Sequence, residues 1–379
     1  MPCFSHARLT CAICVLAFAV RGLAGEGIEA SLSEALGISP WNLAAGARVG
    51  GGYKDNTTLS AFSADASPFL LVGADVFVLR APWDGTEFQF LFTGEDRRYL
   101  DSDETEKEQT FLASSHVRRC FDDAWKLGLE GQYFYLDQIF DASATELDVG
   151  VVRAVGHSGL VRPSVGRALG RGLWFEIEGL AGRYFFEEPL DDYWELGPRF
   201  RLRWEKERGE GSMLLLTYEV LRRSYDDRVE ASRQGVPIEG TELEFVQQKV
   251  ECSWQRTWDE GRRWRTATRI GLDLNRDNGS GYFDYDRYHV SEQVRLRWGR
   301  VTARARVGIS YYDYALQTVS DLTREKRHKM LITVTAGADY RVGRRLKAFG
   351  EYEYERSVSN QDYDAYRANT VFGGFEYEF

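Results

Sequence analysis

Serine lies two residues from histidine at two places in the chain, Ser114 with His116 and His289 with Ser291. Hydrolysis by a serine nucleophile requires a histidine base within hydrogen-bond reach and an acid that orients the histidine. By parity both pairs could share one face of a strand, but pairs at this spacing arise by chance in almost any chain. The sequence therefore predicts no catalytic residues, and we do not expect an enzyme.

Acidic and sulfur-bearing side chains provide no dedicated metal site. The acid-rich stretches 101–108 and 284–286 offer the hard oxygen ligands that calcium prefers, but neither has the spacing of a calcium loop. We expect solvated loop acids, loosely bridged at most to lipid phosphates by divalent ions. Cys120 and Cys252 stand far apart and lack metal-ligand neighbours. No phosphate-binding glycine loop or nucleotide motif occurs, so we predict no metal and no cofactor.

Charged residues recur at alternate positions in three parts of the chain. On one face of alternating segments, acids should oppose bases, and bases should gather beside bases. One interpretation is a constriction whose basic and acidic walls orient polar solutes; the other is that paired charges simply fill a polar interior. Both stay open. The residues concerned are Glu176 and Glu178 opposite Arg199, Arg201 and Arg203; Arg295 and Arg297 beside Arg304 and Arg306; and Glu351, Glu353 and Glu355 near Asp339, Arg341 and Lys329.

The segments that must carry these charges alternate apolar and polar residues with a period of two, which is typical of β-strands. Short connectors rich in glycine and charge alternate strictly with longer acidic ones, so both ends of the chain should lie on one side. The interrupted segment 146–168 is too long for one ordinary span, and totals of 14 or 18 strands stay open. The predicted strands are 42–54, 66–80, 86–95, 108–119, 125–136, 146–168, 172–186, 192–205, 211–224, 241–257, 262–275, 284–298, 301–314, 323–340, 344–356 and 364–379.

The apolar face of these strands has the composition of a lipid-facing surface. Runs such as Leu70, Val72, Ala74, Val76 and Val78 share one parity, and tryptophans fall near the predicted inner ends of strands, where an aromatic belt would lie. Glu292 breaks the pattern, because its parity places a carboxylate on the apolar face. We note a local register shift as one way to avoid that cost.

The start of the chain has the features of a secretory leader. Arg8 precedes an apolar run over 11–20, and small residues at 22–24 suit cleavage after Ala24. Beyond it no apolar run reaches the 18 residues of a membrane helix. Aromatic residues make up 14% of the chain, and the net charge of −10 without a basic stripe argues against a nucleic-acid partner.

The last strand carries alternating apolar residues that end in phenylalanine, at Val371, Phe375, Tyr377 and Phe379. In this feature the chain resembles bacterial outer-membrane β-barrel proteins of the porin-like kind. The resemblance implies that the barrel-insertion machinery reads this strand as an insertion signal. A distant resemblance to the barrel domain of surface-lipoprotein assembly modifiers is also noted.

The sequence thus predicts an all-β protein, a transmembrane antiparallel β-barrel of about 16 strands in the bacterial outer membrane. Residues 1–24 form a signal peptide, 25–41 a short periplasmic segment with a weak amphipathic helix or a frayed tail, and 42–379 the barrel. The function expected is a porin-like channel for small polar solutes. The alternative is a component that exports or assembles a surface polymer or surface protein. Outer-membrane lipid is the surrounding partner in both cases.

Overall fold

A computed structural model of the chain describes residues 41–62, 64–83, 85–102, 104–122, 124–142, 151–206, 211–259, 261, 263–319 and 324–379. The predicted signal peptide and the segment that follows it, up to residue 40, lie outside these residues. No helix within the described part of the chain is long and apolar enough to cross a membrane.

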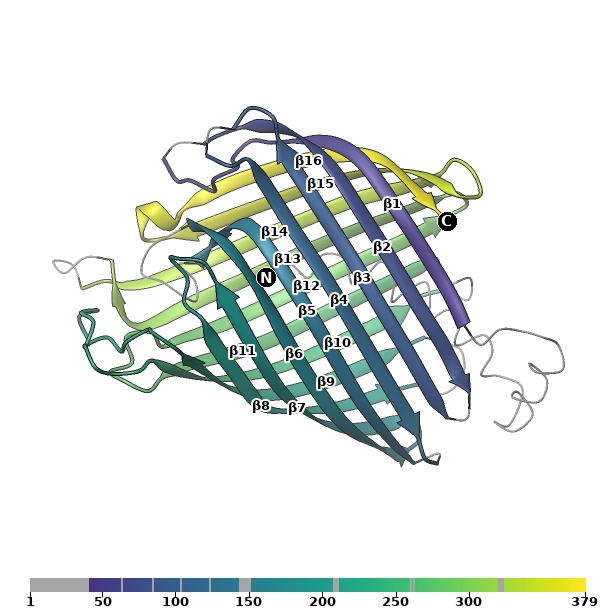
Figure 1. Ribbon diagram of the computed structural model, residues 1–379, viewed down its shortest axis with the longest axis horizontal. Coiled ribbons are helices and arrows are strands. Elements are labelled where there is room, and N and C mark those ends of the chain that lie inside the picture. Colours follow the sequence, from purple (N-terminus) through teal and green to yellow (C-terminus); the bar gives the residue numbers. More distant parts are fainter. Residues whose placement is uncertain are drawn as a thin grey trace.

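The described residues form sixteen strands that close into one barrel, in which every strand pairs antiparallel with its neighbours (Figure 1). The fold class and the strand number predicted from the alternation are confirmed. The 3-10 turn η2 (Asp362–Asp364) precedes the last strand. The strands are β1 (Trp41–Lys54), β2 (Ser67–Trp83), β3 (Thr86–Tyr99), β4 (Lys107–Cys120), β5 (Trp125–Asp141), β6 (Val151–Gly170), β7 (Leu173–Phe186), β8 (Tyr193–Glu205), β9 (Met213–Tyr225), β10 (Glu244–Thr257), β11 (Trp264–Asp277), β12 (Tyr285–Trp298), β13 (Val301–Thr318), β14 (Lys326–Arg341), β15 (Leu346–Ser359) and β16 (Tyr366–Glu378).

The barrel closes where the first strand meets the last. β1 and β16 pair from Gly46 opposite Glu378 to Lys54 opposite Thr370, and the backbone N–H of Phe379 donates to the carbonyl of Ala45 over 2.9 Å. Closure leaves no unpaired strand edge, which is the condition for β-structure to lie in lipid. The chain therefore ends inside its closing strand pair, as the terminal sequence pattern predicts.

Connectors at the two ends of the barrel differ in length. On the side where β1 begins and β16 ends, links such as 171–172 and 299–300 hold two residues, whereas the opposite side carries longer ones such as 55–66 and 226–243. We assign the short links to the periplasm and the long ones to the extracellular side.

The interrupted segment around residue 160 forms one long strand, β6, rather than a strand plus a hairpin. Its pairing with β5 runs unbroken from Val151 to Arg167, while its pairing with β7 skips Arg162 and Pro163. Proline lacks an N–H and cannot complete the ladder on that side. This settles the strand total at sixteen and excludes fourteen and eighteen for this barrel.

The outward face is apolar, as the parity predicts. Leu70, Val72 and Ile270 are each more than half exposed at outward positions, and their exposed surface is what lipid would cover. Tryptophans occupy outward positions at the periplasmic ends of strands, where a belt at the membrane interface is expected. These are Trp41, Trp125, Trp204, Trp254, Trp264 and Trp298.

Glu292 stands at an outward position in the middle of β12 with no register shift. The pairing of β12 with β11 and β13 is continuous across it, so the suggested shift is wrong. Its carboxylate instead accepts a hydrogen bond from the hydroxyl of Thr268 on β11 over 2.5 Å. A single hydrogen bond from a neutral hydroxyl offsets only part of the cost of holding a carboxyl group in the apolar band.

Replacing Glu292 by Leu should stabilise the barrel. The change removes a carboxyl group from the lipid-facing surface, and we expect a gain of about 1 to 2 kcal/mol in the free energy of unfolding. Urea titration of protein refolded into phosphatidylcholine vesicles measures it. Glu244→Leu, at the extracellular end of β10 outside the band, should show no gain because Glu244 holds Arg222. A loss of stability in Glu292→Leu would contradict the lipid-facing assignment.

Candidate functional site: the charged lumen

The inward positions of β11, β12 and β13 form a wall of arginines in the periplasmic half of the barrel. Register places Arg265 opposite Arg295 and Arg295 opposite Arg304, so these residues lie side by side on one face. No acid occupies an inward position in these half-strands, over 264–270, 292–298 and 301–308. We call this surface the basic wall: Arg265, Arg269, Arg295, Arg297, Arg304 and Arg306.

Carboxylates on β14 and β15, the two strands after β13, form an acidic surface beside the basic wall. Asp339 on β14 and Glu351 on β15 both bind Arg304, over 2.6 and 2.7 Å. Glu353 pairs with Arg97 on β3, and Glu355 accepts a hydrogen bond from the hydroxyl of Tyr366. We call this surface the acidic wall: Asp339, Glu351, Glu353 and Glu355. Parity alone predicts these neighbours, whereas the partner Arg97 comes from a strand distant in sequence.

A second charge cluster joins β7, β8 and β9. Glu178 lies opposite Arg199 in the ladder and binds it over 3.2 Å, and Arg201 binds the same carboxylate over 2.5 Å. Glu219 on β9 holds the other side of Arg199. Glu176 instead binds Lys126 on β5 over 3.4 Å. The structure therefore brings Glu178 together with Arg199 and Arg201 as predicted. Arg203 pairs with Glu205 instead, and β5, two strands from β7, contributes Lys126.

The first extracellular loop, residues 55–66, folds onto the barrel interior. Asn56 and Thr57 are almost fully buried, and the side-chain amide of Asn56 donates to the carbonyl of Arg367, 311 residues away in sequence, over 3.0 Å. The hydroxyl of Thr57 donates to Asp65 over 3.0 Å. These contacts hold the loop in place at the extracellular end of the lumen.

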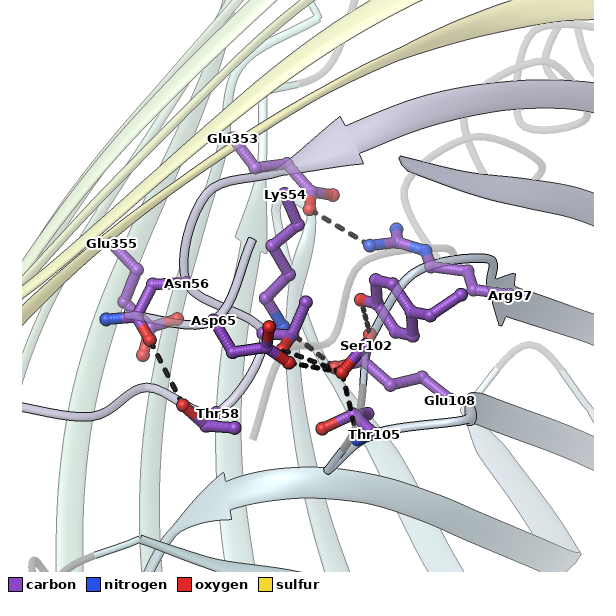
Figure 2. Close-up of polar contacts among 12 residues, drawn as sticks. Lys54, Asn56, Thr58, Asp65, Arg97, Ser102, Thr105, Glu108, Glu353 and Glu355 are labelled. Carbon is purple, nitrogen blue, oxygen red and sulfur yellow. Dashed lines mark hydrogen bonds and ion pairs between the residues drawn. The ribbon is translucent and has the colours of Figure 1, made fainter. Parts of the chain in front are cut away.

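Ion pairs beside this loop join β1 to β4 through Lys54 and join β3 to the acidic wall through Arg97, as Figure 2 shows. The Lys54 amine lies 2.8 Å from a carboxylate oxygen of Glu108, whose other oxygen accepts from the Tyr99 hydroxyl over 3.0 Å. Arg97 reaches Glu353 over 3.5 Å, which joins β3 to β15 across four strand steps. The lumen is therefore much narrower here than the strand number alone implies.

An aromatic cluster underlies Arg97. Its guanidinium stacks over the rings of Phe69 and Phe372, at 5.4 and 4.9 Å from their centres. Such stacking over aromatic faces favours a desolvated arginine by about 1 kcal/mol or more. We expected a polar interior from the sequence and did not predict this cluster. One signal was present, because Phe372 is an apolar residue at an inward position of the last strand. Its members are Phe69, Leu71, Tyr99, Phe349 and Phe372.

The extracellular mouth is crossed by contacts between opposite sides of the barrel. Lys329 on β14 is fully buried and binds Asp141 at the end of β5, a strand on the far side of the ring. Ile139 packs against the cluster of Leu59 and Tyr366 nearby. We call the Lys329–Asp141 pair the mouth tie. It joins two distant parts of the ring at the extracellular end.

The remaining residues considered from sequence gather into no reactive site. Ser114 and His116 share an inward parity on β4, as do His289 and Ser291 on β12, but no nucleophile, base and acid chain is seen among the described residues. His289 lies 3.6 Å from Glu251 and 4.0 Å from Asp273. The described residues contain no group of three or more His, Cys, Asp or Glu side chains suited to a metal.

Sequence reasoning also missed Arg265 and Arg269 of the basic wall and Arg48, which binds Glu95 over 2.9 Å. The signal was present, because the parity rule applied to β11 and β1 assigns all three to the interior. The terminal residues Val371, Phe375, Tyr377 and Phe379 all point outward and are exposed. Their proposed role as an insertion signal stays a prediction.

Comparison with known proteins yields distant likenesses. No family model matches the chain, and no curated protein matches its sequence. Among solved structures, OccAB1 of Acinetobacter baumannii aligns at 8% identity with a TM-score of 0.49, covering 89% of this chain and 97% of that one. OprD of Pseudomonas aeruginosa aligns at 9% identity and 0.46, covering 89% and 95%. An anion-selective porin from Comamonas acidovorans aligns at 10% and 0.43, covering 89% and 99%.

The architecture itself carries the conclusion on fold and location. A closed ring of sixteen antiparallel strands, apolar outside and charged inside, with short links at one end and long loops at the other, is the design of bacterial outer-membrane barrels. The resemblance noted in the terminal strand is thereby confirmed, while that to the assembly modifiers finds no support. The chain is an outer-membrane β-barrel of sixteen strands.

Proposed function

We propose that this barrel is a porin-like channel that conducts small polar solutes and favours anions. The observation that carries the proposal is the basic wall, with six inward arginines and no inward acid in the same half-strands. Charge of one sign along a pore wall raises the local concentration of counter-ions and lowers their barrier to passage. The chain as a whole has a net charge of −10, so the basic wall is a local departure from its composition.

The acidic wall beside the basic wall supports a channel that selects among solutes by their charge and dipole, not by size alone. Arg304 is held between Asp339 and Glu351, whereas Arg295 is flanked on both neighbouring strands by arginines. A solute that passes therefore meets a transverse field from base to acid, which orients dipolar molecules. The arginines of the basic wall and Asp339, Glu353 and Glu355 of the acidic wall keep their side chains partly exposed, as conduction requires, whereas Glu351 is buried.

The narrow extracellular half supports a size limit. Buried side chains and the inward loop fill the region around Lys54 and Glu108, so a solute has to pass beside them. Small polar molecules fit this arrangement better than a folded protein or a bulky polymer.

Reversal potentials across planar bilayers test the proposal. In a KCl gradient the refolded protein should be more permeable to chloride than to potassium. Replacing Arg295 and Arg297 by Ser should move the permeability ratio toward potassium by about twofold or more, because two lumen charges disappear. Arg98 and Arg222, exposed arginines on the outer face, form the matched control pair, and their replacement by Ser should leave the ratio unchanged.

Two outcomes would contradict the proposal. Absence of any conductance in correctly folded protein would remove the channel. A wild-type preference for potassium, or an equal shift in the control pair, would remove the role of the basic wall while leaving the channel in place.

A further inference from the structure

Two arginines face each other on the outer surface of the barrel near its extracellular end. Arg356 on β15 and Arg367 on β16 are direct partners in the register, and both are exposed. Their parity is that of the lipid-facing residues Tyr352 and Val371, so both guanidinium groups point outward. We call them the outer arginine pair.

Like charges directly opposite each other on neighbouring strands are destabilising. Neither guanidinium has an ion pair or hydrogen bond to a side chain in the part of the chain that the structure describes. The nearby carboxylate of Asp55 is engaged by the backbone N–H and the side-chain amide of Asn369, both at 2.6 Å. Among the described residues, therefore, neither arginine has an ion pair of its own that would relieve the repulsion between them.

The other arginines at outward positions near the extracellular rim each bind a neighbouring carboxylate. The hydrogen bond from Arg183 lowers the pKa of Asp226 in the loop after β9 below its ordinary value. The pairs are Arg98 with Asp96, Arg153 with Asp137, Arg183 with Asp226, Arg222 with Glu244 and Arg276 with Asp286.

The height of the outer arginine pair matches the boundary between lipid tails and headgroups. Arg367 precedes the end of β16 by eleven residues, since the strand ends at Glu378. At about 3.3 Å per residue and a tilt of about 45°, that is roughly 25 Å above the periplasmic end, close to the height of the apolar band of such barrels. Below the pair, apart from Asn369, the outward positions are Val334, Tyr352, Tyr354 and Val371, which suit the apolar band.

We propose that Arg356 and Arg367 bind a phosphate group of an anionic lipid in the outer leaflet of the membrane. Two adjacent guanidinium groups supply parallel N–H donors that match phosphate oxygens in pairs. The phosphate removes the repulsion between the arginines, and the lipid tails lie against the apolar strands below. The site is independent of conduction, because it lies on the opposite face of the strands from the lumen.

Lipid binding to the refolded protein tests this site. Purified lipopolysaccharide should bind, and the same material after enzymatic removal of its lipid phosphates, or inorganic phosphate alone, should bind at least about tenfold more weakly. The variant R356S/R367S should bind intact lipopolysaccharide about tenfold more weakly than the wild type. The matched double variant R183S/R222S, on the same outer face, should keep wild-type affinity. Equal binding by R356S/R367S, or no effect of phosphate removal, would overturn the proposal.

The sign of a stability change separates binding from a structural role. In micelles of an uncharged maltoside detergent, which contain no phosphate, R367S should raise the urea midpoint of unfolding, because it removes the repulsion from Arg356. In the same micelles with added lipopolysaccharide the variant should lower the midpoint, because the bound phosphate loses a partner. A decrease under both conditions would show that Arg367 serves only the fold and would refute the site.

Discussion

Replacing Gly374 by Val should prevent the barrel from closing. A Cβ atom at this position would lie 2.1 Å from the carbonyl oxygen of Val49 and 2.6 Å from the Cα of Gly50. Both are backbone atoms of β1, so they cannot move without breaking the β1–β16 ladder. We expect a loss of about 4 kcal/mol or more in the free energy of unfolding, near the extreme for single substitutions.

The seam between β1 and β16 is the place where such a clash does most harm. Every other strand pair joins neighbours in sequence, whereas this pair joins the two ends of the barrel and closes last in any stepwise order. Glycines oppose each other on both strands here, with Gly50 opposite Gly374 and Gly51 opposite Gly373. Their missing side chains let the two backbones approach closely.

The folded fraction can be measured on SDS gels, because a closed barrel that has not been boiled migrates at a different position from the boiled, unfolded protein. Gly374→Val should give almost no folded band after refolding into detergent micelles. The matched control is Gly350→Val on β15, where a Cβ would meet no atom within 4 Å. If Gly374→Val folded as well as the control, the close approach at the seam would be wrong.

The alternation of residues was enough to predict the barrel, because a period of two fixes the face of every side chain once a strand is placed. The same rule assigns Glu178 and Arg199 to the interior and Phe375 to lipid, and the structure places them so. The rule failed to settle β6, because the local signals of glycine and proline suggest a break. The strand continues through Pro163 because its pairing with β5 is complete there, although Pro163 has no N–H to donate toward β7.

The inward folding of the first loop could not be predicted from periodicity. Asn56 is held by the carbonyl of Arg367, and Arg97 by Glu353, and such contacts depend on strands that meet only when the ring closes. The aromatic cluster under Arg97 could not be predicted for a related reason. A lumen is expected to be polar, yet Phe69 and Phe372 lie inside because a cation covers their rings.

Replacing Lys329 by Met should open the extracellular mouth. Lys329 is fully buried, and its amine binds Asp141 on the far side of the ring, where Tyr366 also hydrogen-bonds that carboxylate. Removing one partner of a buried ion pair leaves the other charge uncompensated, at a cost of about 3 to 5 kcal/mol. The apolar contact between Ile139 and Tyr366 is too small to offset this cost. We therefore expect the end of β5 to move away from the mouth, so that Asp141 becomes hydrated.

An open mouth has a measurable consequence. Under the proposed channel function, single-channel conductance of Lys329→Met should rise severalfold, and swelling of liposomes in sugars of increasing size should show a larger exclusion limit. Lys347→Met is the matched control, because Lys347 also pairs with carboxylates, Glu376 and Glu378, but lies at the periplasmic end. An unchanged exclusion limit in folded Lys329→Met would mean that another part of the lumen, such as the narrowing at Arg97 and Glu353, limits passage.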